Sequence, residues 1–434
     1  MSQSLREQAV RIYTGGLSHI TPEALLRATL HPQDDALAVD FLEGPARVEL
    51  RPGGRIFLLC IGKAAAPMAE EAARMLAGRV HQGLVITKHG FGLPGLPWPV
   101  LETGHPVPDQ SGADAAVAVE AMLSNTEPDD LVVVMVSGGA SALLPAPLEG
   151  IGLAQKQDII DLMLRTNMDI HQINMVRKAI SRFKGGGLAR LAAPARVLGL
   201  YLSDVPGDNL SSIGSGPTVP EAVNGPAVIA LLREKGIWDK APAQVRAALE
   251  ARGTVPAEMA QAPLNGLIGT NRHLLRAMAD VARKAGFTAH VEEQPTTGLN
   301  PEAMPGLLQR WEALCARHGA GPLCLISGGE TTVEITGNGM GGRCQELAAM
   351  MLPRMDGDTV FLAAGSDGND GPTDAAGGVV DAESWQRIQA GGIPYEALLA
   401  DNDSYHLLER SGNLIKVPPT RNNVMDVHLF LRQG

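Results

Sequence analysis

The sequence LVVVMVSGGASALL, residues 131–144, joins an uninterrupted apolar run to a glycine turn. Leu131–Val136 contains no polar residue, which is typical of a strand whose two faces are both covered by helices. Gly138 and Gly139 allow the backbone to turn sharply where that strand ends. The stretch therefore predicts a strand followed by a βα turn, the unit from which α/β proteins are built.

The same alternation of apolar runs and helical patterns continues along nearly the whole chain. The apolar runs predicted as strands are 56–61, 83–87, 131–136, 196–202, 264–268, 289–292, 322–326 and 359–363. The stretches rich in Ala, Leu and Glu that are predicted as helices include 67–76, 113–123, 155–164, 173–183, 274–285 and 304–318. We therefore expect an α/β protein with mostly parallel sheets, whose ligands bind at the carboxyl ends of the strands.

The composition excludes several functional classes. The chain has 434 residues, of which 45% are apolar and 19% are charged, an ordinary globular balance. The net charge of −11 argues against sequence-independent binding of nucleic acid, which relies on a basic surface. Aromatic residues make up only 3%, which argues against base stacking and against an aromatic sugar-binding cleft.

The cysteines and apolar segments predict a cytoplasmic protein. Cys60, Cys315, Cys324 and Cys344 form no C-x-x-C pair, so we expect free thiols in a reducing compartment rather than a zinc site. The first 13 residues include Arg6, Glu7 and Arg11 and lack the apolar core of a signal peptide. The longest tight apolar run, 131–136, is far too short to span a bilayer.

Two domains are predicted, because the stretch 231–262 is charged, contains several prolines and has no strand pattern. We expect an N-terminal domain over residues 1–240 with a Rossmann-like, mostly parallel sheet and helices on both faces. A linker over 241–262 and a smaller C-terminal α/β domain over 263–434 follow. Both halves place Ser, Gly and Asp after their strands, in a similar order but at different spacing.

Cations beside glycine turns are the first candidates for anion binding. Lys63 follows Gly62 between a predicted strand and a predicted helix, where a positive helix end and backbone N–H groups favour an anion. It does not belong to a Walker A loop, since Ala64 stands where that loop has Ser or Thr. An ordinary solvated lysine is the alternative.

Further glycine and serine positions point to the same chemistry. Ser137, Gly138, Gly139 and Ser141 form either a cradle for a phosphate or carboxylate, or a plain βα turn. Lys184 precedes three consecutive glycines, which suggests a close approach to a ligand or to another backbone.

The motif at 337–342 matches G-x-G-x-x-G, but its context argues against a dinucleotide site. The preceding residues 332–336 alternate between polar and apolar, whereas a Rossmann first strand is a buried apolar run. Arg343 then stands at the start of a predicted helix, an end that disfavours cations. An anionic ligand would remove that conflict.

Acidic turns supply candidate metal ligands and bases. Asp204 follows the predicted strand 196–202, and Asp367 follows the predicted strand 359–363. Each carboxylate suits either Mg²⁺ or a general base, and an exposed acidic turn is the alternative in a chain this acidic. The loop at 367 is not an EF-hand, because Gly378 occupies loop position twelve.

Taken together, these motifs resemble those of the MOFRL-family glycerate 2-kinases, in order and from about residue 11 to residue 427. The matching segments are GKA at 62–64, GHPVPD at 104–109, VSGGASAL at 136–143, VRK at 176–178 with Ser181, KGG at 184–186, LSDVPGD at 202–208, IGSGPT at 213–218, SGGETT at 327–332, GR at 342–343 with QEL at 345–347, GSDG at 365–368 and TD at 373–374. One departure is Asn422, where the pattern has Thr.

The resemblance implies two α/β domains with the active site in the cleft between them, and ATP-dependent phosphorylation of D-glycerate at its 2-hydroxyl. Lys63 and Arg343 match the central residues of the family. In this scheme the loops at Ser137–Ser141 and at Ser327, Gly328, Gly329 and Glu330 present backbone donors, and Lys184 binds phosphate. Asp204 and Asp367 hold Mg²⁺ or act as base, and the two roles stay open. The expected partners are the small molecules glycerate and ATP, with no nucleic acid or membrane.

Two alternatives remain. Proteins of this type are also named hydroxypyruvate reductases, which use NAD(P)H, and the G-x-G-x-x-G letters at 337–342 are the only support for that activity. A metabolite-binding protein without catalysis is disfavoured, because binding alone does not need carboxylates beside cations. The sequence predicts neither the oligomeric state nor the preference among small hydroxy acids.

Overall fold

The computed structural model describes residues 4–166 and 168–434, and the chain divides into two compact units. Residues 22–268 form one unit, called here the continuous unit. Residues 1–21 and 269–434 form the other, called here the split unit. The two units are described separately.

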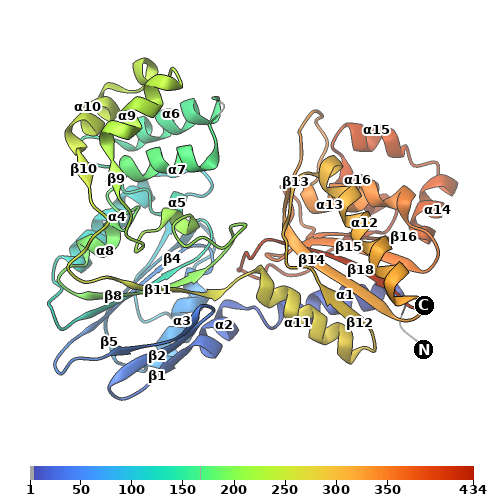
Figure 1. The fold of residues 1–434 in the computed structure, drawn as a ribbon, viewed down its shortest axis with the longest axis horizontal. Coiled ribbons are helices and arrows are strands. Elements are labelled where there is room, and N and C mark those ends of the chain that lie inside the picture. The colour runs from blue at the N-terminus through green and yellow to red at the C-terminus, as the bar shows by residue number, and fades with distance from the viewer. Residues whose placement is uncertain (1–3, 167) are drawn as a thin grey trace. The chain divides into compact units, whose positions relative to one another are not determined.

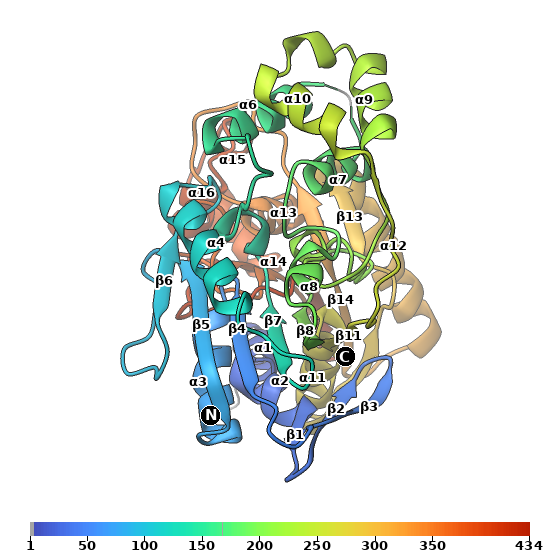
Figure 2. The same ribbon diagram turned by 90° about the vertical axis from the view of Figure 1, so that its left-hand side faces the viewer.

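A six-stranded sheet forms the centre of the continuous unit, in the order β11-β8-β7-β4-β5-β6 (Figure 2). The pairs β8–β7, β7–β4, β4–β5 and β5–β6 are all parallel. These strands are β4 (Ile56–Ile61), β5 (Val80–Lys88), β6 (Val100–Thr103), β7 (Leu131–Val136), β8 (Arg196–Leu202) and β11 (Leu264–Gly269). Every residue of β4 and β7 is buried, as their apolar sequences predict.

Helices cover both faces of this sheet, which confirms the predicted Rossmann-like layering (Figure 1). On one face, α4 (Gln110–Leu123), α5 (Ala140–Leu143) and α8 (Gly187–Leu191) share a core with alternate residues of β4 and β7. On the other face, α3 (Ala65–Leu76) contacts β4, β5 and β7. Next to α3 lies α2 (Pro22–Thr29), and a small antiparallel sheet follows it, made of β1 (Leu30–Pro32), β2 (Ala36–Phe41) and β3 (Gly44–Glu49).

A helical group in the continuous unit has its own apolar core. Its helices are α6 (Leu153–Leu164), α7 (Ile170–Ala179), α9 (Gly225–Glu234) and α10 (Ala243–Arg252), with a short pair of strands β9 (Val223–Asn224) and β10 (Thr254–Val255). The segment 241–262, predicted as a linker, therefore lies inside this unit. Val245 and Leu249 of α10, one helical turn apart, are fully buried and hold the helix against α9.

The split unit differs from the expected pattern, because most of its strand pairs are antiparallel. Its main strand order is β12-β14-β18-β15-β16-β17, with β13 also paired to β14. Only β12 and β13 run parallel to β14. The strands are β12 (Thr288–Val291), β13 (Thr296–Leu299), β14 (Leu323–Thr332), β15 (Thr359–Gly365), β16 (Gly377–Asp381), β17 (Leu414–Ile415) and β18 (Asp426–Arg432).

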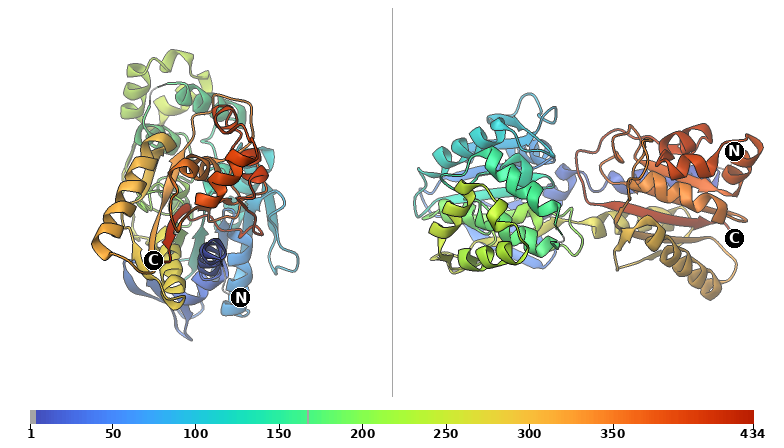
Figure 3. Two further views of the ribbon diagram at one scale, coloured as in Figure 1. Left: turned by 90° about the vertical axis from the view of Figure 1, so that its right-hand side faces the viewer. Right: turned by 90° about the horizontal axis from the view of Figure 1, so that it is seen from above.

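Two groups of helices pack on that sheet. The first group is α12 (Asn300–His318), α13 (Arg343–Met351), α14 (Ala382–Ala390), α15 (Tyr395–Ala400) and α16 (Ser404–Arg410), and their core includes Trp311 stacked on Phe430. The second group is α11 (Asn271–Lys284) and the N-terminal helix α1 (Leu5–Leu17). The blue helix α1 lies among the orange and red elements of this unit (Figure 3), so the predicted boundary of the first domain at residue 1 does not hold.

Candidate active site

The carboxyl edge of the six-stranded sheet contains a topological switch point between β4 and β7. From β4 the chain proceeds through β5 and β6 to one side, and then returns to place β7 and β8 on the other side. Ligands bind at such points in open α/β sheets, because the two diverging connections leave a crevice. Lys63 follows β4 and Ser137 follows β7, so the structure places two predicted site segments at this edge.

The two turns at this point are joined by backbone hydrogen bonds. Lys63 N donates to the Gly138 carbonyl at 2.9 Å, and Ala64 N donates to Ser137 Oγ at 3.1 Å. Gly62 has a φ of +130°, and a Cβ there would collide with Ser137. The Ser137 hydroxyl is buried and fixes the loop that carries Lys63.

Three different side chains lie around the Gly138-Gly139 turn. A Cβ on Gly138 would collide with the Asp204 carboxylate, so Asp204 lies directly on this glycine. A Cβ on Gly139 would lie 2.9 Å from His105 Cδ2 and 3.5 Å from Lys63 Cγ. Lys63, Asp204 and His105 therefore surround one glycine turn, and the absence of side chains from both glycines makes room for them.

His105 is a candidate site residue that the sequence reasoning did not select. Burial and the positive charges of Lys63 and Lys88 lower the pKa of His105 to about 4, so the imidazole is neutral at pH 7. Neutral imidazole accepts a hydrogen bond through one ring nitrogen. The signal was the segment 104–109 directly after β6, which we used for the resemblance but not for the site.

The remaining predicted residues of the continuous unit form a second contact group beside this turn. Lys184 Nζ donates to Ser141 Oγ at 2.6 Å, and the Ser141 and Ser215 hydroxyls lie 3.0 Å apart. Gly185 and Gly186 both have positive φ, which explains the glycine run after Lys184. Lys184 itself is only 4% exposed.

In the split unit, Arg343 forms a two-point ion pair with a buried carboxylate. Its Nε and Nη2 donate to Asp426 Oδ2 at 2.5 Å and Oδ1 at 2.9 Å, and Nη2 lies 3.3 Å from Glu330. Burial lowers the pKa of the Arg343 guanidinium, but Asp426 and Glu330 outweigh that effect and raise it overall. Arg343 also lines a cavity of about 400 Å³ together with Glu330, so it is held in place and still reachable.

Arg343 is a cation at the amino end of α13, where the helix dipole is positive, and nearby protein carboxylates compensate this unfavourable arrangement. Gln345 N donates to Asp370 Oδ2 at 2.8 Å, so Asp370 caps α13. Burial raises the pKa of Asp370, although hydrogen bonds from Gln345 and Cys344 oppose the shift. Asp370 and Asp426 were not predicted as site residues, because an acidic residue in a loop looks the same in sequence whether it is buried or exposed.

The segment Ser327, Gly328 and Gly329 is not the loop that we predicted. These residues lie inside β14, where they pair with His428, Val427 and Asp426 of β18. Gly329 also pairs with Thr296 of β13. A Cβ on Gly328 would collide with Asn271, so this glycine serves the contact between β14 and α11. The prediction that this segment presents free backbone donors was wrong, because a strand uses its donors in the sheet.

Asp367 lies next to the Arg343 group. A Cβ on Gly365 would lie 3.3 Å from Asp367 Oδ1 and 3.6 Å from Asp426 Oδ1, so both carboxylates flank the end of β15. Since β18 runs antiparallel to both β14 and β15, the amino end of β18 meets the carboxyl ends of its neighbours. That topology places Asp426 at the same edge as Asp367.

The glycines of the G-x-G-x-x-G match have a packing role. A Cβ on Gly337, Gly339 or Gly342 would collide with Asp401, Asp403 or Asp370, respectively. The strand β14 ends at Thr332, ten residues before the helix, so the motif is not a tight turn between a strand and a helix. This geometry removes the support that the motif gave to a dinucleotide site.

We predict an acidic limb in the pH profile that depends on Asp426. Burial raises the pKa of Asp426 to about 6, although Arg343 opposes this shift. Its contribution to the free energy of unfolding is therefore greatest below about pH 4 and is lost as the pH rises through about 6. Positioning of Arg343 requires the ionised form, so kcat/KM should rise through about pH 6. Asp426→Asn should give lower values without that limb, and an unchanged limb in this variant would contradict the assignment.

Comparisons with known proteins place the chain in a family. Residues 8–250 match a family described as a domain of unknown function, DUF4147, and residues 323–426 match the MOFRL family. The glycerate 2-kinase of Pyrococcus horikoshii is 34% identical over 98% of this chain and 97% of its own. The D-glycerate 2-kinase of Thermotoga maritima is 34% identical over 99% of both chains.

Two further comparisons bear on fold and activity. A crystal structure of a glycerate kinase from Thermotoga maritima has a TM-score of 0.87 at 32% identity over 99% of both chains. A protein of Agrobacterium vitis, named provisionally as a hydroxypyruvate reductase, is 34% identical over 88% of both chains. With relatives of this identity along nearly its whole length, the chain belongs to the glycerate 2-kinase family and contains a MOFRL region.

Proposed function

We propose that this protein transfers the γ-phosphoryl group of ATP to the 2-hydroxyl of D-glycerate, giving 2-phosphoglycerate and ADP. The observation that carries the proposal is the convergence of Lys63, His105 and Asp204 on the Gly138-Gly139 turn at the switch point. Phosphoryl transfer needs positioned positive charge and an oriented nucleophile rather than covalent help. The family relationship to glycerate 2-kinases supports this reaction.

Lys63, His105 and Arg343 have different roles in the proposed reaction. Lys63 neutralises charge on the transferred phosphoryl group, and backbone donors of the glycine turn orient its oxygens. His105, which is neutral at pH 7, accepts a hydrogen bond from the 2-hydroxyl and orients it for in-line attack. Arg343 is held by Asp426 and offers its exposed face to an anionic oxygen.

A Mg²⁺ ion that enters with ATP fits the surroundings of Asp204. Mg²⁺ retains several waters and takes one or two carboxylates in addition to phosphate oxygens, so it does not need a preformed cage. Throughout residues 4–166 and 168–434, no group of three or more His, Cys, Asp and Glu side chains is arranged to hold a metal. Asp204 lies directly on Gly138, in the turn where the phosphate is proposed to bind. When bound, the ion would neutralise phosphate charge.

We predict that Asp204→Asn separates the two roles left open for this carboxylate. If Asp204 binds the metal, the Mg²⁺ concentration required for half-maximal rate rises. If it acts as base, kcat falls while the Mg²⁺ dependence stays the same. Asp367→Asn provides the parallel test for the second carboxylate. Asp114→Asn, on the exposed face of α4, is the control, and rates equal to that control in both variants would exclude Asp204 and Asp367 from catalysis.

The decisive experiment for the activity is an assay with ATP, Mg²⁺ and D-glycerate, in which the phosphate position is read by ³¹P and ¹³C NMR. Phosphate on C2 supports the proposal, and phosphate on C3 or no product contradicts it. NADH and NADPH with hydroxypyruvate form the second assay, because one relative has a reductase name. Oxidation of either cofactor would favour that second activity.

The location and partners are also proposals. No helix among the described residues is long and apolar enough to cross a membrane. The four cysteines are free thiols, three of them buried, which supports a reducing cytoplasmic environment. The proposed partners are small molecules only, glycerate and ATP.

A further inference from the structure

The continuous unit contains a cluster of poorly exposed cations that the proposed chemistry at Lys63 does not use. Lys156, Lys178 and Lys184 are 3%, 9% and 4% exposed, and Arg177 on α7 is half-buried. We call these four residues the buried cation cluster. They come from α6, from α7 and from the turn before α8.

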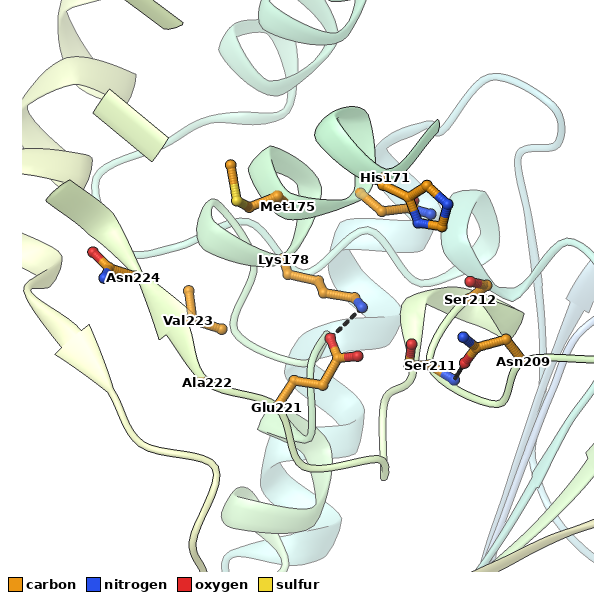
Figure 4. A pocket seen from close by; sticks show the side chains of 11 residues that line it. His171, Met175, Lys178, Asn209, Ser211, Ser212, Glu221, Ala222, Val223 and Asn224 are labelled. Carbon is orange, nitrogen blue, oxygen red and sulfur yellow. Dashed lines mark hydrogen bonds and ion pairs between the residues drawn. The ribbon is translucent and has the colours of Figure 1, made fainter. Parts of the chain in front are cut away.

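Among residues 4–166 and 168–434, carboxylates compensate only one member of this cluster. Lys178 forms an ion pair with Glu221 (Figure 4). Lys156 donates to the Pro145 carbonyl, and Lys184 donates to Ser141 Oγ and, at 3.4 Å, to the Gly214 carbonyl. Among the described residues, the Arg177 guanidinium has no hydrogen-bond partner. Burying cations without a counter-charge costs stability, so the cluster needs an explanation.

The pKa shifts agree with the missing counter-charge. Burial, followed by the positive charges of Arg177, Lys156 and Lys178, holds the pKa of Lys184 well below its ordinary value. Burial, Arg177 and Arg182 lower the pKa of Lys156 to about 7. No carboxylate contributes to either shift. The carboxyl end of α7 favours Arg177 and Lys178, but Lys156 and Lys184 do not belong to that helix.

The cluster is adjacent to the glycine turn of the candidate site. Ser141, which accepts from Lys184, is two residues beyond Gly139, and a Cβ on Gly214 would lie 3.2 Å from Ala140 Cβ. A Cβ on Gly185 would lie 3.6 Å from Lys178 Cδ, so Lys178 packs on the turn that follows Lys184. Beside Lys178 opens a polar pocket of about 280 Å³, lined also by His171, Asn209, Ser211 and Ser212 (Figure 4).

We propose that the buried cation cluster, with the Ser141 and Ser215 hydroxyls, binds the polyphosphate chain of the nucleotide. This inference rests on the proposed function and places the phosphates that remain on ADP next to Lys63. The excess of cations over carboxylates is larger than a single carboxylate such as glycerate can balance, whereas a di- or triphosphate balances it. Arginine forks and serine hydroxyls are ordinary phosphate donors.

Binding without turnover tests the inference. ADP and inorganic tripolyphosphate are titrated calorimetrically into the full chain and into the variants Arg177→Met and Lys184→Met. We expect both probes to bind at least about tenfold more weakly to each variant. Arg165→Gln is the matched control, because it removes one exposed cation from the end of α6 without touching the cluster. It should bind both probes like the wild type.

Thermal unfolding distinguishes a phosphate-binding role of Lys184 from a purely structural one. Lys184→Met should leave the midpoint of the ligand-free protein unchanged or higher, because it removes an uncompensated buried cation, and it should abolish stabilisation by tripolyphosphate. If Lys184→Met fails to fold, Arg177→Met still decides, since Arg177 is half-buried and donates to no described residue. Wild-type binding in either folded variant, or equal weakening in Arg165→Gln, would overturn the inference. A protein that binds tripolyphosphate through Arg177 but does not phosphorylate glycerate would retain this site and refute only the proposed function.

Discussion

Replacing Lys63 by alanine should lower kcat by about a hundredfold or more, the scale of losing one charge that stabilises a transition state. The aliphatic stem of Lys63 lies beside Gly139 in the glycine turn. The fold should survive, because Lys63 is only partly buried and its backbone bond to Gly138 does not depend on the side chain. Steady-state kinetics with ATP and D-glycerate, beside a thermal unfolding curve, measure both effects.

The control for this variant is Arg74→Ala, at the far end of α3, the helix that follows Lys63. Arg74 is exposed and pairs with Glu70 and with the buried Glu71, which also pairs with Arg27, so its loss should cost little stability and no rate. If Lys63→Ala turns over glycerate like this control, Lys63 has no part in the reaction.

The second large effect is expected for Arg343→Ala, again about a hundredfold or more in kcat. In addition, this variant leaves Asp426 buried beside Asp370 without its cation, which should raise the pKa of Asp426 further. Arg343→Lys keeps the charge but loses the fork that matches the Asp426 carboxylate, so we expect it to recover only part of the rate.

Arg354→Ala is the matched control, because Arg354 is an exposed cation just beyond the end of α13. Its kinetics should equal those of the wild type. Full activity of Arg343→Lys would mean that charge alone is needed and that the two-point pairing with Asp426 is unimportant for catalysis.

Local patterns predicted the strands of the continuous unit well. The predicted bounds of 56–61, 131–136 and 196–202 agree with β4, β7 and β8. Each of these is an apolar run that ends at Gly or Ser, and burial on both faces requires such a run. The split unit was harder, because β14 continues through Ser327, Gly328 and Gly329, whose composition is typical of a turn. Its pairing with β18, about a hundred residues later, outweighs the local preference.

The candidate site could also be predicted only where local sequence patterns indicate it. A cation next to glycine at a helix start is a local signal, and on that signal we predicted Lys63 and Arg343 as candidates. The partners of Arg343 and the neighbours of Gly139 come from distant segments, so Asp426, Asp370 and His105 were missed. The predicted domain bounds differ from the two units for the same reason. Gly16 contacts Met278, and the local sequence around neither residue indicates that contact.

The N-terminal helix α1 has a consequence for how the protein is made. Its Tyr13 hydroxyl donates to the Gly365 carbonyl at 2.7 Å, and Asn422 donates to the Ile20 carbonyl at 2.6 Å. During synthesis α1 leaves the ribosome before α11, β15 and β18, the elements against which it packs. The continuous unit, residues 22–268, has its whole sequence available early and folds as a block. Helix α1 can therefore take its place in the split unit only after the chain beyond residue 268 has been synthesised.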